Sequence, residues 1–367
     1  MRLKWIFALG IVFIITLYLL ISGYPYFISL SWDYLKGLGY KGSISTIQVL
    51  PDENGYGDFQ GFAVIKWATG LKEPFSMAQG KDGAFYISLP KEGKILKIED
   101  ASKSGLGEKT NVFASDLKEP SALAFYEDKL LVAEPGKLVG ITDSDGDGDG
   151  DIFEDWVSDL PLGENLGMAI DRAKNVAYLS LVESGVGKVM AIDLKEKKSY
   201  QFASGFREPS GLAINGQNGD LLGVDSGFLS SKEKIYSEIN LVVERLNYGY
   251  PQCFNSDTEN KCPDAVLPIW ELGAGSYPSG LAFYTGSAFP PEYQNNLFVG
   301  FRGLFSAQSR AIWRFKLVPF SGSYAISAYP FAYGFNRIVD ITMGVDGNLY
   351  ILDSGSGEIY QIMAVYK

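Results

Sequence analysis

An internal repeat constrains the fold of this chain more than any other feature of its sequence. Six similar segments begin at residues 71, 117, 162, 206, 276 and 336, among them LKEPFSMA, LKEPSALA, LGENLGMA and FREPSGLA. Most are followed by a turn and a second apolar strand, as in DGAFYIS (82–88) and DGNLYILD (346–353), and then by a third, as in KLVGI (137–141). Asp-Gly and Asn-Gly turns between alternating strands are typical of β-hairpins. A fourth strand then leads into the next repeat.

Four strands per unit, at about 45 residues in the regular units, are typical of a β-propeller blade. The six units therefore predict an all-β fold, a six-bladed β-propeller of four-stranded antiparallel blades over residues 59–367. The first strand, FAVIKWATGL (62–71), has no earlier unit to join, and the last unit lacks a fourth strand. We expect these two to pair, because pairing closes the ring and removes a sheet edge.

The N-terminal region has the features of a membrane anchor. Residues 5–21 carry no charge and are long enough to cross a bilayer core, and Arg2 and Lys4 precede them. By the positive-inside rule the N-terminus stays in the cytoplasm. We interpret residues 1–23 as a transmembrane helix, a signal-anchor, and residues 24–58 as a juxtamembrane stem. The membrane is then a partner and the protein a single-pass protein of the cell membrane, with its propeller on the extracytoplasmic side. A cleaved signal peptide is the alternative, but ISGYPYF lacks a small-x-small cleavage site.

Two further features agree with an extracytoplasmic location and exclude one class of partner. Cys253 and Cys262 are the two cysteines of the chain and flank a polar loop, FNSDTENK. A disulfide is the better interpretation in an oxidising compartment, and two unpaired thiols are the alternative. The formal net charge of −11 argues against nucleic acid, which needs a basic surface.

One acidic loop has a metal-binding pattern. Residues 143–154, DSDGDGDGDIFE, fit the EF-hand calcium pattern at every constrained position, although β-like rather than helical sequence flanks them. A calcium ion would neutralise aspartates that otherwise repel one another. A flexible, solvated acidic loop is the alternative. The expected calcium ligands are Asp143, Asp145, Asp147, Asp149, Asp151 and Glu154.

From Gly61 to the C-terminus the chain resembles the soluble pyrroloquinoline-quinone (PQQ) glucose/sorbosone dehydrogenases. The similarity is carried by GFAVIKWATGLKEP, FREPSGLAINGQNGDLLGVDSG and SEINLVVERLNYGYPQC, and by the two final repeats. The resemblance implies a six-bladed propeller, PQQ as cofactor and the oxidation of a sugar or aldose. Some members also carry an Asp-rich loop similar to residues 143–151.

The resemblance also implies site residues, and several differ here. The histidine that serves the family as general base corresponds to Glu164, and this chain contains no histidine at all. The family's cofactor-binding arginine corresponds to Arg207, and the asparagine beside it to Glu208. Two further family histidines fall at Gly275 and Arg302. We therefore expect Glu164 as the catalytic residue. The expected cofactor-binding residues are Arg207, Glu208, Arg302 and Arg337.

The repeat alignment predicts which residues surround one mouth of the central channel. They open the innermost strand of each unit and are Glu73, Glu119, Glu164, Glu208, Tyr277 and Arg337. We call these the ring residues. An acidic ring would repel PQQ, which carries three carboxylates, unless a cation or arginines intervene. Alternatively, each glutamate hydrogen-bonds backbone at the end of a loop.

Three function classes remain open at this stage. The first is a PQQ-dependent sugar dehydrogenase in which Glu164 replaces the histidine base. The second is a non-catalytic extracellular calcium-binding interaction propeller with a sugar or glycan ligand. The third is a metal-dependent hydrolase similar to the six-bladed lactonases, which hold calcium in the channel.

Overall fold

The computed structural model describes residues 47–50, 58–229, 234–253, 262–303 and 310–366. Within these ranges no helix is both long enough and apolar enough to span a bilayer. The expected anchor at residues 1–23 and most of the expected stem lie outside the described residues. The end of that stem is described: β1 (Gln48–Val49) pairs with β24 (Ser323–Tyr333) at the outer edge of a blade.

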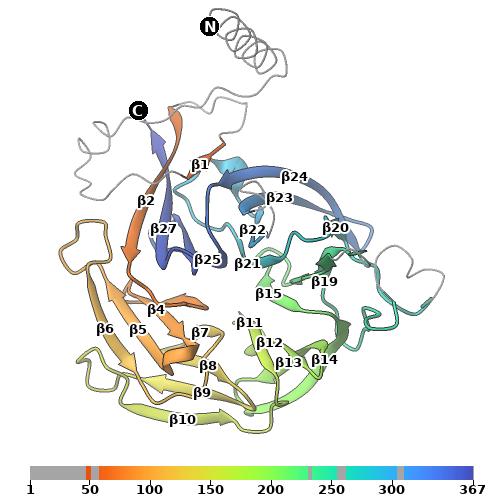
Figure 1. Cartoon of the computed structure of the whole chain (residues 1–367), viewed down its shortest axis with the longest axis horizontal. Helices are drawn as coiled ribbons and strands as arrows, with labels where there is room; N and C mark the ends of the chain where they lie inside the picture. Colours follow the sequence, from red (N-terminus) through yellow and green to blue (C-terminus); the bar gives the residue numbers. More distant parts are fainter. Residues whose placement is uncertain (1–46, 51–57, 230–233, 254–261, 304–309, 367) are drawn as a thin grey trace, which may run out of the picture.

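Six β-sheets are arranged around a common centre (Figure 1), so the predicted six-bladed propeller is confirmed. Within each sheet, neighbouring strands are antiparallel, as the Asp-Gly and Asn-Gly hairpin turns require. The first strand named in each blade below is the innermost.

Blade one consists of β3 (Met77–Gln79), β4 (Phe85–Leu89), β5 (Lys94–Glu99) and β6 (Lys109–Ala114). Blade two consists of β7 (Leu123–Tyr126), β8 (Lys129–Glu134), β9 (Lys137–Thr142) and β10 (Ile152–Val157). Blade three consists of β11 (Glu164–Asp171), β12 (Val176–Glu183), β13 (Val186–Asp193) and β14 (Lys198–Phe206).

Blade four consists of β15 (Pro209–Ile214), β16 (Leu221–Asp225), β19 (Ser237–Leu241) and β20 (Trp270–Leu272). Blade five consists of β21 (Pro278–Phe283), β22 (Leu297–Phe301), β23 (Ala311–Phe320) and β24, with β1 added outside. Blade six consists of β25 (Ile338–Met343), β26 (Leu349–Asp353), β27 (Glu358–Tyr366) and β2 (Phe59–Thr69). A small hairpin, β17 (Phe228–Leu229) and β18 (Lys234–Ile235), and two 3-10 helices, η1 (Pro90–Glu92) and η3 (Pro291–Tyr293), complete the described elements.

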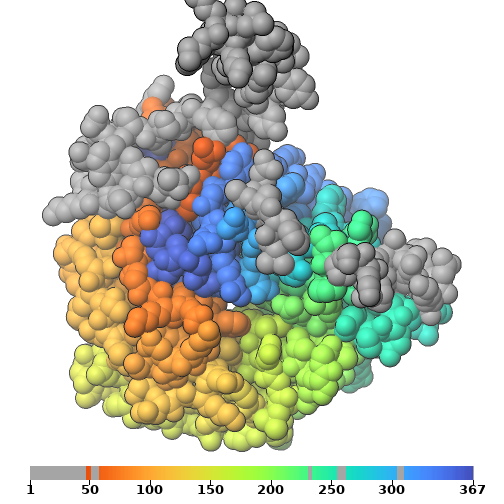
Figure 2. All heavy atoms as spheres, viewed as in Figure 1, coloured from red at the N-terminus to blue at the C-terminus, as the bar shows by residue number. Residues whose placement is uncertain are grey.

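The ring closes as the repeat pattern predicts. Strand β2, from the start of the propeller, pairs antiparallel with β27, from Phe59 opposite Tyr366 to Thr69 opposite Glu358. In the space-filling view the start of the propeller (orange) therefore lies directly against its C-terminal end (blue) (Figure 2). Ile65 and Ile362, which lie on these paired strands, are fully buried, so closure also buries apolar surface.

One position in the inner strands sets how closely the blades approach. In blades three to five it is Gly167, Gly211 and Gly280. A Cβ on Gly167 would lie 3.0 Å from the Cα of Gly211, and one on Gly280 would lie 2.5 Å from the Cα of Asp340, so these sites lack room for a side chain. At the closure between blades six and one, the equivalent residues are Asp340 and Ser76. There the Ser76 hydroxyl donates a hydrogen bond to the Asp340 carboxylate at 2.9 Å.

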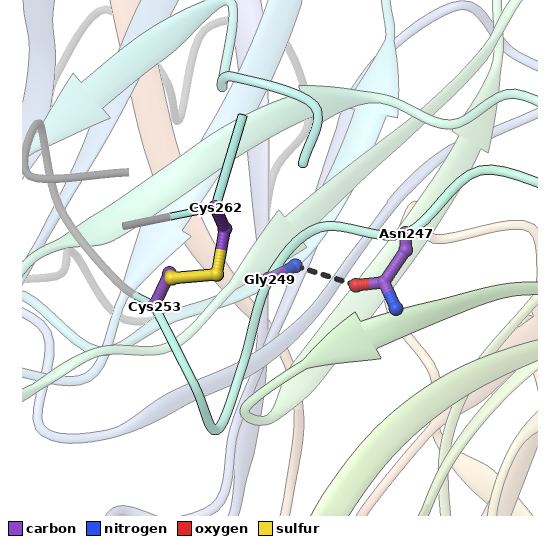
Figure 3. The surroundings of a disulfide bond; sticks show 4 residues. All are labelled: Asn247, Gly249, Cys253 and Cys262. Atoms are coloured by element: carbon purple, nitrogen blue, oxygen red, sulfur yellow. Dashed lines mark hydrogen bonds between the residues drawn. A yellow bond between two sulfur atoms is a disulfide. The ribbon is translucent and has the colours of Figure 1, made fainter. Parts of the chain in front are cut away.

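The predicted disulfide is confirmed. Cys253 and Cys262 are bonded in the long connection between β19 and β20 (Figure 3). The same connection is fixed near its start, where the Asn247 side chain accepts the backbone N–H of Gly249 at 2.7 Å. The insertion of blade four is thus cross-linked by a disulfide bond.

Candidate active site at the channel mouth

Two cavities follow the axis of the propeller. One of about 380 Å³ is lined by the inner strands of all six blades. A second, of about 390 Å³, lies at the start of the inner strands of blades one to three, and Glu119, Glu164 and Asn165 contribute to its wall. Phe75 and Leu166 line both cavities, so the two adjoin. We call the second cavity and the ring residues around it the channel mouth.

Three of the six ring residues share a local backbone conformation as well as a place in the repeat. Glu73, Glu119 and Tyr277 have positive φ angles of 48°, 46° and 48°. Positive φ is uncommon outside glycine, so the same value at the same repeat position in three blades marks one turn type. This turn brings the chain from the outer strand of one blade to the inner strand of the next.

In blade four a buried carboxylate holds the corresponding connection in place. Asp225, the last residue of β16, accepts the backbone N–H groups of Arg207 at 2.9 Å and Glu208 at 2.6 Å. Burial raises the pKa of Asp225 to about 6, and the two backbone hydrogen bonds and the Arg207 charge oppose that rise. Asp225 therefore fixes the backbone from which both candidate cofactor residues project.

Blades six and two repeat this arrangement. Asp353, at the end of β26, accepts the backbone N–H groups of Asn336 at 2.6 Å and Arg337 at 2.8 Å. Glu134, at the end of β8, accepts that of Lys118 at 2.9 Å. Sequence reasoning missed these acids as site residues, although the signal was present: the second strand ends in an acid in LLVAE, LLGVD and LYILD.

Two of the expected cofactor-binding arginines converge on a third expected residue. Glu208 Oε2 lies 3.3 Å from Nη1 of Arg207, and Glu208 Oε1 lies 3.0 Å from Nη2 of Arg302. Arg207 also donates to the carbonyl oxygens of Ser226 at 2.7 Å and Gly227 at 3.0 Å. The side chains of Glu208 and both arginines are partly exposed, at 31% and 23%. We call this group the arginine pair with Glu208.

A row of carboxyl groups crosses blade four beside this group. On adjacent strands, Glu238 stands in register with Asp225 on one side and Glu271 on the other. Burial, and then the charge of Asp225, raise the pKa of Glu238 to about 8. Glu238 is therefore largely protonated at neutral pH. Glu238 lies in the family-like segment SEINLVVERLNYGYPQC, but the register that aligns the three acids depends on the length of the insertions between strands and could not be predicted from the sequence.

The expected catalytic residue lies in the mouth but apart from the arginine pair. Glu164 opens β11 and is exposed. Beside it, Asn165 is only 4% exposed, and neither polar atom of its side chain has a hydrogen-bond partner in the part of the chain that is described. Arg337 is exposed and enters the site through its backbone N–H to Asp353. Among the described residues, no hydrogen bond or ion pair joins the side chain of Glu164 or Arg337 to the arginine pair with Glu208.

The acidic loop joins β9 to β10, as expected, and brings three of the six predicted ligands together. Carboxylate oxygens of Asp143, Asp145 and Asp147 lie within 4.8 Å of one another. The Asp143 carboxylate accepts hydrogen bonds from the backbone N–H groups of Gly146 and Gly148, which help to shape the turn. Glu154 lies on β10 and forms an ion pair with Lys197 of the neighbouring blade, away from these three residues.

The other two predicted ligands lie at the end of the loop. Asp151 accepts hydrogen bonds from the backbone N–H and hydroxyl of Ser144 at 2.9 and 2.5 Å, which lower the pKa of Asp151. The backbone N–H of Asp149 donates to Asp147 at 2.9 Å. The donor set present suits calcium, which prefers carboxylate and carbonyl oxygens, although three carboxylates leave the remaining places to carbonyls or water.

Residues 190–361 match the family model of the glucose / sorbosone dehydrogenases. Over these residues the chain is similar to the glucose/sorbosone dehydrogenase family. This segment contains the arginine pair with Glu208, the row of acids and the disulfide loop. Residues 76–171 match a model described as a domain of unknown function. An uncharacterized protein of Borreliella burgdorferi is 28% identical over 194 residues, or 47% of this chain, which spans about half (51%) of that relative's length.

Solved structures share the fold at low identity. A glucose dehydrogenase of Thermus thermophilus is 20% identical with a TM-score of 0.65, over 83% of this chain and 100% of that one. The holo PQQ domain of a Coprinopsis cinerea pyranose dehydrogenase is 14% identical with a TM-score of 0.68, over 89% and 98%. A PQQ-bound aldose sugar dehydrogenase of Streptomyces coelicolor is 16% identical with a TM-score of 0.62, over 88% and 100%. These likenesses show that the chain shares the propeller fold of these structures.

Proposed function

We propose that this chain is a membrane-anchored, extracytoplasmic propeller of the sugar dehydrogenase type that takes a sugar or glycan at its channel mouth, with PQQ as the implied cofactor. The family match and the shared fold support the general kind of protein. The observation that carries the proposal is the convergence of Arg207 and Arg302, from successive blades, at the mouth. Paired guanidinium groups suit the carboxylates of PQQ, which would supply a hydride acceptor when bound.

The residues fit that cofactor only in part. Both arginines are already engaged by Glu208, so the pair does not accept a cofactor carboxylate as it stands. The base is also altered, because the chain has no histidine and carries Glu164 at the corresponding position. Loss of histidine removes the side chain best matched to proton transfer at neutral pH. We therefore expect the native chain to oxidise aldoses weakly or not at all.

Dye-linked oxidation of glucose and other aldoses, with PQQ and calcium supplied, tests this proposal. We expect no turnover above background for the native chain and a gain of turnover for Glu164→His, which restores an imidazole at the aligned position. Glu119→His is the matched control, because it places the same side chain in the same cavity from the neighbouring blade. Strong dye reduction by the native chain, lost in Glu164→Gln, would contradict the expectation and make Glu164 the base.

A second candidate, a non-catalytic calcium-binding interaction propeller, is favoured by one observation, the grouping of Asp143, Asp145 and Asp147. A channel metal, as a lactonase-type hydrolase requires, has no comparable support. Among the described residues, three acidic side chains with carboxylates close enough to share an ion occur only in this loop. Divalent-dependent opening of a lactone by the purified chain would revive that third interpretation.

A further inference from the structure

We propose that Glu208 is an internal latch, whose carboxylate occupies the arginine pair and must leave before the pair can hold the carboxylate of a ligand. The inference rests on the proposed function for the identity of the ligand, PQQ, but not for the presence of an anion site. It assigns to Glu208 the control of that site.

The contacts of Glu208 are those that a bound carboxylate would make. One oxygen is 3.3 Å from Arg207 and the other is 3.0 Å from Arg302, so each arginine takes one oxygen. Charge-assisted hydrogen bonds of this kind are stronger than neutral ones and specific in geometry. A ligand carboxylate and Glu208 would therefore compete for the same two donors.

The backbone of the latch is fixed while its side chain can move. Asp225 accepts the backbone N–H of Glu208 at 2.6 Å and that of Arg207 at 2.9 Å, which holds the turn. The Glu208 side chain is 31% exposed, so rotation about its own bonds carries the carboxylate into solvent. Release of the latch needs no movement of the blades.

The local charge explains why the latch matters. The positive charges of Arg207 and Arg302 are matched by the negative charges of Glu208 and Asp225, so the group is close to neutral. A tricarboxylate gains little by approaching a neutral group. Removing the charge of Glu208 leaves one net positive charge and two guanidinium groups without a carboxylate partner on Glu208, although Arg207 keeps its hydrogen bonds to the carbonyl oxygens of Ser226 and Gly227. A net positive charge of this kind attracts an anion.

Glu208 does not satisfy all the hydrogen-bond donors of Arg302. Its Nη2 binds Glu208, but its Nε is buried without a hydrogen-bond partner in the described part of the chain. A buried donor without a partner costs free energy. The pair is therefore not optimised for Glu208 alone, and this lowers the cost of exchanging the latch for a ligand with more acceptor atoms.

A binding titration of the full chain tests the latch directly. The probes are PQQ and trimesate, a redox-inactive aromatic tricarboxylate, each titrated by calorimetry at pH 7 and fixed calcium. We expect Glu208→Gln to bind trimesate and PQQ about tenfold more tightly or better than the native chain, since two charge-assisted donors are freed. We expect Arg302→Gln in the Glu208→Gln background to remove the gain.

Glu119→Gln is the matched control, because it removes one charge from the equivalent ring position of another blade, at the wall of the channel mouth. An equal gain in Glu119→Gln would show a general effect of mouth charge and would overturn the latch, as would no gain in Glu208→Gln. A gain for trimesate without a gain for PQQ would keep the latch and reject PQQ in the proposed function. Glu208→Asn is the second variant. If both Glu208 variants failed to fold, as judged by circular dichroism, Glu208 would be a structural tie between blades and the latch would again be overturned.

Discussion

Single residues decide how the ring of blades is held together at its centre. Where blades three to five use glycine to let inner strands approach, the closure between blades six and one uses Ser76 and Asp340. Asp340 also accepts the backbone N–H of Met77 at 2.8 Å and that of Ile341 at 2.8 Å. Burial raises the pKa of Asp340 to about 6, opposed by these hydrogen bonds. A titratable group therefore lies at the joint of the ring.

This carboxyl gives a prediction about stability and pH. Because the pKa of Asp340 is higher in the folded chain (about 6) than its ordinary value of 3.8, the folded chain retains a proton that the unfolded chain loses. Stability from this group is then greatest below pH 4, falls as the pH rises towards 6, and stays level above it. Urea unfolding at a series of pH values measures this effect. Between pH 4 and 6 the free energy of unfolding should fall by up to about 3 kcal/mol less in Asp340→Asn than in the native chain.

Asp149→Asn, a change in the acidic loop, provides the control for Asp340→Asn. It should leave the decline between pH 4 and 6 as it is in the native chain. A native chain whose unfolding free energy rises through this window, with no difference in Asp340→Asn, would contradict the assignment.

At the scale of strands and loops, the repeat made the fold predictable and left parts of the site hidden. The hairpins, the closure of the first strand onto the last unit and the place of the acidic loop all follow from strand spacing and turn residues. The partners of side chains do not follow from spacing. The alternative in which each ring glutamate hydrogen-bonds to the backbone does not fit two of them. The Glu208 carboxylate contacts Arg207 and Arg302. The Glu73 carboxylate contacts Lys91. The acids that accept backbone N–H groups of the turn are instead Asp225 and Asp353, at the ends of the second strands β16 and β26. Strand pairing brings them to the turn, and the spacing of the repeat does not reveal this.

The acidic loop gives a prediction at this scale. Calcium should raise the melting temperature of the native chain, since an ion that binds only the folded state stabilises it by mass action. Asp145→Ala combined with Asp147→Ala should abolish the rise, because two of the three grouped carboxylates are removed. Differential scanning fluorimetry with calcium and with chelator measures both.

Glu154→Ala is the informative companion to the double variant. Glu154 belongs to the twelve-residue pattern but is paired with Lys197, so its removal should leave most of the calcium response intact. An unchanged calcium response in the double variant would discard the site.

At the scale of the whole molecule, the chain combines a closed acidic propeller with a disulfide-bonded insertion in blade four. The formal net charge is −11, and the one disulfide lies in the family-matched part of the chain. A disulfide in a native protein is typical of an oxidising compartment. It agrees with the orientation expected from Arg2 and Lys4, in which the propeller lies outside the cytoplasm.

That orientation can be measured on intact cells. Protease added from outside should digest residues 40–367, and thiol reagents should label Cys253 and Cys262 only after reduction. A cytoplasmic protein followed in the same cells serves as the control for lysis. Full protection of the propeller in cells whose outer surface is accessible would reject the orientation.

The pairing of β2 with β27 also sets an order of events during synthesis. Strand β2 is the first full-length strand of the propeller to be made, yet its partner is the last, so the ring stays open until the C-terminus has been synthesised and delivered. Contacts this distant along the chain are slow to form. During that interval β2 has an unpaired edge, which other chains can join. A nascent or C-terminally truncated chain is therefore exposed to aggregation in a way that the finished ring is not.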